Sequence, residues 1–217
     1  MLRPKYKLVI FDFDGTLADT LPWFESVFDQ VADRHGFKRI DRSEVAALRA
    51  MDSRQLLRHQ RVPLWKVPFI MRDVRSMLAR DIRTISLFPG VATALAQLSG
   101  AKVTLAIVTS NSRHNVGAVL GAEQTAWFQY LECGVSMFGK AAKLRKVLKA
   151  SRIAPDEALF VGDEIRDAQA AAAVGVAFGA VSWGYTFPDA LKAHAPRESF
   201  SVVGDWVDTL LSQSAEL

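Results

Sequence analysis

The chain has 217 residues, half of them hydrophobic, which is enough for one sizeable core or for a core domain with an insertion. Its net charge of +4 is modest and its basic residues are spread along the chain, so a nucleic-acid-binding surface is not indicated. The single cysteine, Cys133, excludes an intrachain disulfide and a cysteine-based metal site, and the four histidines lie far apart without ligand spacing.

The first apolar run, "KLVIF" at residues 7–11, is continuous rather than alternating, which predicts a strand buried on both faces of a parallel sheet. The apolar run is too short for a signal peptide, and no 18-residue apolar span follows, so we expect a cytoplasmic protein without membrane contact. Asp12-Phe13-Asp14-Gly15-Thr16 comes next. Either this is an ordinary strand-to-loop turn, or the chain presents two carboxylates for chemistry.

The interval from Leu17 to about Phe88 has the pattern of helices only. Apolar residues at i, i+3, i+4 and i+7 spacing predict a helix over 68–81, with Pro68 near its start. Further helices are predicted over 22–35, 42–49 and 53–61. The simplest account is a helical insertion at 17–87 within a core domain formed by 1–16 and 88–217.

After this insertion, strand-like runs alternate with helix-like stretches. The strand-like runs cover 102–108, 157–163 and 175–182, and the helix-like stretches include 90–100 and 139–152. Such alternation is typical of βαβ units. The predicted fold class is therefore α/β, with an open parallel-sheet, Rossmann-like core and an inserted all-helical domain.

Polar residues follow the predicted strands of this core. Thr109-Ser110-Asn111 follow the run at 102–108, "GVSMFGK" leads to Lys140 at a helix start, and residues 162–167 follow the run at 157–163. Ligands of open α/β sheets bind outside the carboxyl ends of the strands. We therefore expect carboxylates, a hydroxyl and a lysine to meet at one edge of the sheet.

Four of these stretches, "DFDGT", "VTSN", Lys140 and "GDEIRD", resemble the four signature motifs of the haloacid dehalogenase (HAD) superfamily, in the same order. The resemblance covers the whole chain, and the helical insertion resembles a C1 cap. "DFDGTLADT" and "VGDEIRDAQAAAAVGV" most resemble the phosphoglycolate-phosphatase-like branch. The resemblance implies a Mg²⁺-dependent phosphatase that hydrolyses a small-molecule phosphomonoester.

In this resemblance Asp12 is the nucleophile, which forms a covalent aspartyl-phosphate and so splits the reaction into two easier steps. Asp14 would protonate the leaving oxygen and then take a proton from the attacking water. Mg²⁺ prefers hard oxygen ligands. The resemblance implies that its protein ligands are Asp12, the backbone carbonyl of Asp14 and Asp163.

The resemblance also implies which residues neutralise the phosphoryl charge. Lys140 would provide positive charge to the nucleophile and the phosphoryl group, although Lys143 lies one turn along the same helix. Thr109, Ser110 and Asn111 would bind phosphoryl oxygens, with Ser110 as the alternative to Thr109 for the hydroxyl role. These groups would stabilise charge in the transition state.

Other polar residues are assigned to the surroundings of this site. Thr16 and Asp167 would support it, Asp167 by ordering a metal-bound water or by reaching Lys140. Glu164 is either a third metal ligand or a carboxylate outside the metal site. Arg49 and Arg54 flank a predicted loop between cap helices, where they are either surface residues or contacts for an anionic substrate.

Two other functions are the alternatives. One is a phosphomutase of the β-phosphoglucomutase type, which shares these motifs. The other is a non-catalytic phosphate-binding or phosphoryl-receiver protein, which likewise uses acidic residues, a strand-end hydroxyl and a lysine on a parallel sheet. Dehalogenation is disfavoured because dehalogenases of this superfamily lack the second aspartate, which is present here as Asp14. The expected partner is a small phosphorylated molecule, with neither nucleic acid nor membrane, and the chain is expected to act as a monomer or homodimer.

Overall fold

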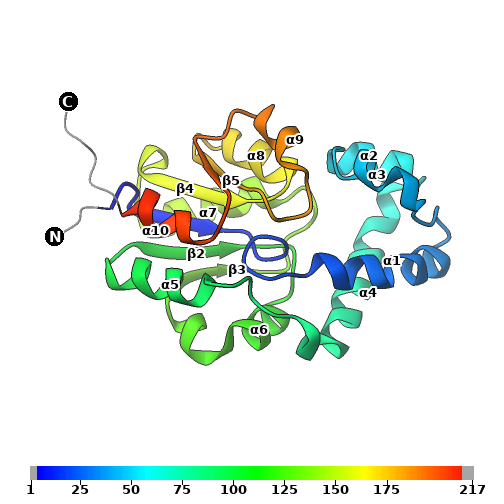
Figure 1. Ribbon diagram of the computed structural model, residues 1–217, viewed down its shortest axis with the longest axis horizontal. Coiled ribbons are helices and arrows are strands. Elements are labelled where there is room, and N and C mark those ends of the chain that lie inside the picture. Colours follow the sequence, from blue (N-terminus) through cyan, green and yellow to red (C-terminus); the bar gives the residue numbers. More distant parts are fainter. Residues whose placement is uncertain (1–3, 212–217) are drawn as a thin grey trace.

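The computed structural model describes residues 4–211. The ends of the predicted core domain, residues 1–3 and 212–217, lie outside the described residues. The chain forms a sheet with helices on both faces. A group of helices, α1 to α4, lies beyond the carboxyl ends of the strands (Figure 1). Within the described part of the chain, no helix has the length and apolar character needed to cross a membrane.

Within residues 4–211, the sheet has six strands in the order β3-β2-β1-β4-β5-β6, and every pair is parallel. The strands are β1 (Leu8–Phe11), β2 (Thr104–Val108), β3 (Phe128–Glu132), β4 (Ala158–Gly162), β5 (Ala177–Val181) and β6 (Glu198–Phe200). The predicted parallel α/β fold is therefore confirmed. Strand order reverses beside β1, so the chain's first strand lies at the place where ligands bind in such sheets.

The central position of β1 explains its continuous apolar sequence. Val9 and Phe11 belong to the hydrophobic cluster on one face, whereas Leu8 and Ile10 belong to the cluster on the other. All four side chains are fully buried. Because successive residues of a strand point to opposite faces, a strand covered on both sides must be apolar at every position.

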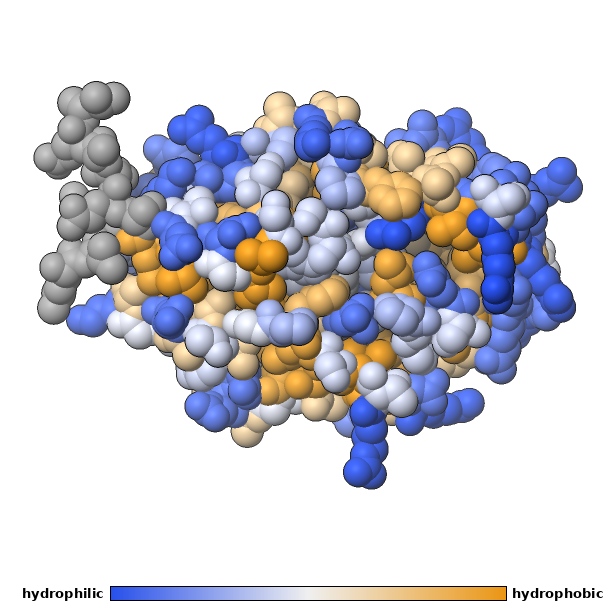
Figure 2. Space-filling view, viewed as in Figure 1, coloured by the Kyte–Doolittle hydropathy of each residue, from blue (hydrophilic) through white to orange (hydrophobic). Residues whose placement is uncertain are grey.

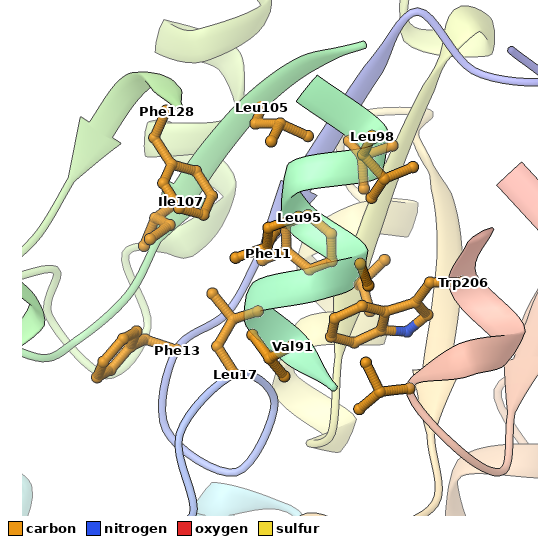
Figure 3. Packing of buried hydrophobic residues seen from close by; sticks show 14 of the residues in the cluster. Phe11, Phe13, Leu17, Val91, Leu95, Leu98, Leu105, Ile107, Phe128 and Trp206 are labelled. Atoms are coloured by element: carbon orange, nitrogen blue, oxygen red, sulfur yellow. The ribbon is translucent and has the colours of Figure 1, made fainter. Parts of the chain in front are cut away.

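Helices cover both faces of the sheet. One face packs against α5 (Val91–Gly100), α6 (Arg113–Ala126) and α10 (Gly204–Leu210). The other packs against α7 (Lys140–Ser151), α8 (Ile165–Ala172) and α9 (Pro188–Lys192). Figure 3 shows the first face, where Phe11, Leu95 and Trp206 come together; the rings of Phe11 and Trp206 lie 5.0 Å apart.

The predicted helical insertion consists of helices, with some changes in their bounds. They are α1 (Leu21–His35), α2 (Val45–Leu48), α3 (Ser53–His59) and α4 (Val67–Arg80), with short 3-10 turns at Arg42–Glu44, Leu64–Lys66 and Ile82–Thr84. The helix expected over 42–49 is thus a 3-10 turn followed by α2. Asp52 starts α3, because its carboxylate accepts from the backbone N–H groups of Arg54 and Gln55.

The two connections between this insertion and the core run side by side. Ala18 and Leu87 form an antiparallel bridge. The backbone N–H of Asp19 donates to the Ser86 carbonyl at 2.9 Å, and that of Phe88 donates to the Leu17 carbonyl at 3.0 Å. The insertion therefore joins the core through one paired neck next to the end of β1.

Two strands of the sheet are not predicted by the apolar runs of the sequence. β3 carries polar residues and its register against β2 shifts between Leu105 and Ala106, while β6 has only three residues. Both lie at the edges of the sheet, where one side of a strand is free of pairing and an apolar sequence is not required. The segment "GVSMFG", residues 134–139, which precedes α7, is a loop.

Candidate active site

The polar residues predicted to meet at one edge of the sheet do so. Asp12 directly follows β1, Asp163 directly follows β4, and Lys140 is the first residue of α7. The backbone N–H of Asp12 donates to the Val161 carbonyl at 2.8 Å, which extends the β1–β4 ladder to the first aspartate. All three side chains are almost fully buried.

Lys140 joins two carboxylates. Its Nζ lies 2.5 Å from Oδ2 of Asp12 and 2.5 Å from Oδ1 of Asp167. Burial opposes the charged ammonium, but the two carboxylates outweigh it and the pKa of Lys140 is raised. Lys143, the alternative candidate, is half-exposed and pairs with Glu132 at 2.9 Å. Of the two lysines, the geometry therefore brings Lys140 into the site.

Asp163 is held by both of its oxygens. The Thr16 hydroxyl donates to Oδ1 at 2.7 Å, and the backbone N–H of Tyr185 donates to Oδ2 at 2.8 Å. A Cβ at Gly15, where φ is 74°, or at Gly184 would overlap the Asp163 carboxylate. Glycine is needed at both positions, because the backbone approaches this carboxylate on two sides.

Three carboxylates meet beneath this edge. Asp12, Asp163 and Asp167 each offer an oxygen, and these oxygens lie within 4.8 Å of one another. Burial and then neighbouring negative charges, first that of Glu164, raise the pKa of Asp163 well above its usual range. Burial also raises the pKa of Asp167 to about 6, although Lys140 opposes this. Buried carboxylates repel one another when they are all ionised, and a bound divalent cation would offset this repulsion. Three carboxylate oxygens this close together are also the hard ligands that such a cation prefers.

Asp14 has a different environment. It is less buried than Asp12, and Nδ2 of Asn111 donates to its Oδ1 at 2.9 Å. Burial, with a smaller contribution from the charge of Asp12, raises the pKa of Asp14 to about 7, and the hydrogen bond from Asn111 opposes this. Asn111 is fixed in turn by Asn115, whose Nδ2 donates to Oδ1 of Asn111 at 2.9 Å.

The three residues after β2 occupy different places. The Thr109 hydroxyl is fully buried and accepts from the backbone N–H of Asn111 at 3.0 Å. Ser110 lines a cavity next to Asp14, and the Asn111 side chain is engaged with Asp14. All three residues therefore lie at the site. The Asn111 side chain, however, donates its hydrogen bond to Asp14.

A cavity of about 200 Å³ lies between the core and the helical insertion. Asp14, Ser110, Asn111 and Tyr185 are among the residues that line it on the core side, and the residues of the insertion that line it are mainly aromatic and aliphatic. Asp12 is not among the lining residues, so the cavity begins at the second aspartate. Figure 2 shows hydrophobic residues on the surface where the core meets the insertion.

The two arginines of the insertion have other partners. Arg49 donates from Nε to the Tyr185 carbonyl at 2.8 Å and from a terminal nitrogen to the Gly184 carbonyl at 2.7 Å. Its guanidinium also stacks over the Phe187 ring at 4.3 Å. Arg54 is exposed, near the ring of Phe138. Neither lines the cavity, and Arg49 joins the insertion to the core.

Three residues of the site were missed from the sequence. Gly184 and Tyr185 lie in the "WGYT" loop after β5, which ends at the same edge of the sheet as β1 and β4. Reading the residues after β5 together with those after the other strands would have found them. Asn115 lies in the first turn of α6, four residues after Asn111, which precedes the N-cap Ser112; the turn into the helix brings the two side chains together.

Glu164 and Arg166 form an ion pair beside this site. Nε of Arg166 donates to Oε1 of Glu164 at 2.9 Å, and both residues line the cavity. The acidic side chain is therefore engaged by a guanidinium, and the cluster of three carboxylates is completed by Asp167 instead.

A parallel α/β sheet with buried carboxylates and a lysine at its carboxyl edge, covered by a helical insertion after the first strand, defines a class of capped α/β enzyme. The sequence profile of haloacid dehalogenase-like hydrolases matches residues 9–181, and the chain belongs to this family. The phosphoglycolate phosphatase of Synechococcus elongatus is 34% identical over 189 residues, which are 87% of this chain and 89% of that protein.

Other relatives cover nearly the whole chain. The probable phosphatase IndB of Dickeya dadantii is 29% identical over 221 residues, 96% of either chain. Among solved structures, a haloacid dehalogenase-like hydrolase of Streptococcus pneumoniae has a TM-score of 0.76 and 20% identity, covering 94% of this chain and 98% of that one. CbbY of Rhodobacter sphaeroides in complex with phosphate has a TM-score of 0.72 and 22% identity, covering 94% and 99%. These two likenesses concern the fold.

Proposed function

We propose that this protein is a Mg²⁺-dependent phosphatase that hydrolyses a small-molecule phosphomonoester through an aspartyl-phosphate on Asp12. One observation carries the proposal: two aspartates two residues apart have different environments. Asp12 is ion-paired with Lys140, whereas Asp14 lines the cavity with a pKa raised to about 7. A nucleophile and a proton donor require this kind of difference between neighbouring carboxyl groups.

In the first step, a carboxylate oxygen of Asp12 attacks phosphorus as the bond from phosphorus to the ester oxygen breaks. The electron pair of that bond goes to the leaving oxygen, and Asp14 gives this oxygen its proton. A pKa near 7 keeps a substantial part of Asp14 protonated at neutral pH, as a general acid requires. The products are the free alcohol, a phosphorylated Asp12 and an ionised Asp14.

In the second step, water attacks phosphorus of the aspartyl-phosphate. Asp14 takes a proton from this water, the bond between phosphorus and the Asp12 oxygen breaks, and phosphate leaves. Asp12 regains its carboxylate and Asp14 its proton, so the cycle closes. The hydrogen bond from Asn111 keeps Asp14 oriented through both steps.

Asp12, the backbone carbonyl of Asp14 and Asp163 would hold the Mg²⁺ ion. When bound, Mg²⁺ supplies Lewis-acid neutralisation of the phosphoryl oxygens. Thr16 orients Asp163 through its hydroxyl, and Asp167 orients Lys140 by accepting from its Nζ.

The phosphoryl group would lie against positive and hydrogen-bonding groups. Lys140 would neutralise its charge. The phosphoryl oxygens would be bound by the hydroxyl of Thr109, with Ser110 as the alternative, and by Asn111, which lie at the same carboxyl edge of the sheet. Donors fixed in a buried site stabilise developing charge more strongly than water does, because they need no reorganisation.

Residues 17–87 would form the cap domain, and 1–16 with 88–217 the core. The paired neck at Ala18 and Leu87 supports this division, since few contacts cross at a domain boundary. A cap of this kind excludes water and selects the leaving group when closed.

The test is phosphate release from a panel of phosphomonoesters, phosphoglycolate included, with Mg²⁺ and with a chelator. Wild type should release phosphate with Mg²⁺. Asp12→Asn and Asp14→Asn should lose at least a hundredfold in kcat, whereas Asp156→Asn, at an exposed position, should not.

Three results would overturn the proposal. Release of no phosphate from any ester would remove the hydrolase assignment. Isomerisation of a sugar phosphate with only slow phosphate release would favour the phosphomutase. A stable phosphorylated Asp12 without turnover would favour the receiver protein.

A further inference from the structure

The cap contains a buried side-chain amide. The side chain of Gln60 is 2% exposed and lines the cavity between cap and core. Among the described residues, neither its Oε1 nor its Nε2 has a hydrogen-bond partner. A buried amide without a partner is destabilising, so its presence at the wall of a mainly apolar cavity requires an explanation.

The backbone of Gln60 is well fixed, so the side chain is not the end of a frayed segment. Its N–H donates to the Leu56 carbonyl at 2.9 Å, at the end of α3, and its own carbonyl accepts from the Lys38 N–H at 3.2 Å. The amide is therefore presented to the cavity by a well-ordered turn.

A row of aromatic rings forms one wall of the same cavity. Tyr185 of the core lies 5.9 Å from Phe24, Phe24 lies 5.6 Å from Phe28, and Phe28 lies 5.6 Å from Phe37, between ring centroids. All four line the cavity. The Thr20 hydroxyl lies 3.0 Å from the Tyr185 hydroxyl and positions the first ring. The row leads from the catalytic edge into the cap.

The remaining cap lining is mainly aliphatic. It includes Leu56, Leu57, Val62, Ile70, Met71 and Val74. The volume of about 200 Å³ exceeds that of an apolar cavity of about 150 Å³ in another protein that takes up benzene. A ring-sized apolar group therefore fits, and it would replace water that these walls hold poorly.

We propose that the cap selects a phosphomonoester whose leaving group has an apolar, ring-sized body and ends in a hydrogen-bonding group that pairs with Gln60. This rests on the proposed function, in which Asp14 protonates the leaving oxygen at the core end of the cavity. A hydroxyl, carbonyl or amide can pair with Gln60, because the amide both donates and accepts.

Phosphoglycolate is the competing substrate. Its leaving group is small and carries a carboxylate, which would leave the aromatic wall uncontacted and would be costly to bury against it. Arg75, whose Nε is buried without a partner among the described residues, also lines the cavity and is the group that could pair with such a carboxylate. The test therefore includes this compound.

The test compares 3-(4-hydroxyphenyl)propyl phosphate, 3-phenylpropyl phosphate and phosphoglycolate. The first two differ only in one hydroxyl at the far end of the leaving group. Wild type should have the highest kcat/KM for the hydroxylated ester, about tenfold above the phenyl ester, because only the hydroxylated ester gives the Gln60 amide a hydrogen-bond partner. A higher kcat/KM for phosphoglycolate than for both ring esters would overturn the proposal.

Gln60→Leu removes the amide and keeps the approximate volume. In this variant the preference for the hydroxylated ester should disappear, because no amide remains to pair with its hydroxyl. The free variant should be at least as stable as wild type, because an unsatisfied buried amide is lost. Gln30→Leu, on the exposed side of α1, should leave the preference unchanged. A preference that survives Gln60→Leu would also overturn the proposal.

A second measurement separates this inference from the proposed function. Binding of the free alcohol, 3-(4-hydroxyphenyl)propan-1-ol, is followed by calorimetry in the presence of a chelator, where no turnover occurs. Binding to wild type and loss of binding in Gln60→Leu support the cap assignment even if no ester is hydrolysed. Phosphate release from small esters without any binding of this alcohol would overturn the cap assignment alone.

Discussion

Arg49 of the helical insertion donates to the backbone carbonyl of Tyr185 in the core at 2.8 Å, and the N–H of the same Tyr185 binds Asp163 at 2.8 Å. One peptide segment thus connects the cap to a candidate metal ligand. A closed cap would hold the loop that orients this ligand, so the position of the cap and the affinity for the cation are expected to be coupled.

We predict that Arg49→Met weakens Mg²⁺ activation. The variant loses two hydrogen bonds to the loop at 184–185, and groups that orient a metal ligand typically contribute 10–100-fold in metal affinity. The Mg²⁺ concentration for half-maximal activity should therefore rise about tenfold. Arg54→Met, at an exposed position, is the matched control and should not change it.

The pair of lysines on α7 gives a second prediction. Lys140→Met should lower kcat by about a hundredfold or more, since a buried cation next to the nucleophile is lost. It should also lower the free energy of unfolding by about 3–5 kcal/mol at pH 8, because it leaves the carboxylates of Asp12 and Asp167 buried without a cation. Lys143→Met removes a half-exposed pair with Glu132 and should change both quantities little.

The core of this fold is predictable from the sequence because its signals are local. A fully buried strand such as β1 must be apolar at every position, and the polar residues that follow each strand must meet at one edge. These two rules predict that Asp12 and Asp163 lie together, and their carboxylate oxygens do lie within 4.8 Å of each other. Lys140 joins them from the start of α7.

The roles of Asn111 and Gln60 were not predictable, since they depend on the packing of distant segments. Asn111 follows β2 like the other phosphate-binding candidates, but its side chain meets Asp14, 97 positions away. Gln60 is an ordinary helix-end residue in the sequence. Its amide is buried only where the helical insertion packs against the core, and there it has no hydrogen-bond partner within residues 4–211.

Asn111→Ala should change the pH dependence of the reaction. The amide donates to the charged form of Asp14 and so lowers its pKa, against the larger effect of burial. Removing it should raise the pKa of Asp14 and keep the general acid protonated to higher pH. The alkaline limb of the pH profile of kcat/KM should therefore move to higher pH. A pH series from 5 to 9 checks this. A limb that moves to lower pH would show that Asn111 does not act on Asp14 in this way.

Asp163 gives a prediction for stability. Its pKa is raised by burial and by neighbouring carboxylates above that of an unfolded-state aspartate, about 3.9. Between these two values the folded state binds more protons than the unfolded state. The metal-free protein should therefore lose stability as the pH rises from about 4 through the raised pKa.

Asp163→Asn replaces this carboxyl group with an amide that does not ionise, so the stability of the variant should fall less steeply as the pH rises. Without metal at pH 8, the variant should be more stable than wild type, while Asp156→Asn, at an exposed position, should match wild type. Mg²⁺ should stabilise the wild-type protein, because it binds the ionised carboxylates of the folded state. It should stabilise Asp163→Asn little. Denaturant unfolding from pH 5 to 8, with chelator and with Mg²⁺, measures all of this. An equal slope in both proteins would mean that Asp163 ionises as freely in the folded chain as in the unfolded one.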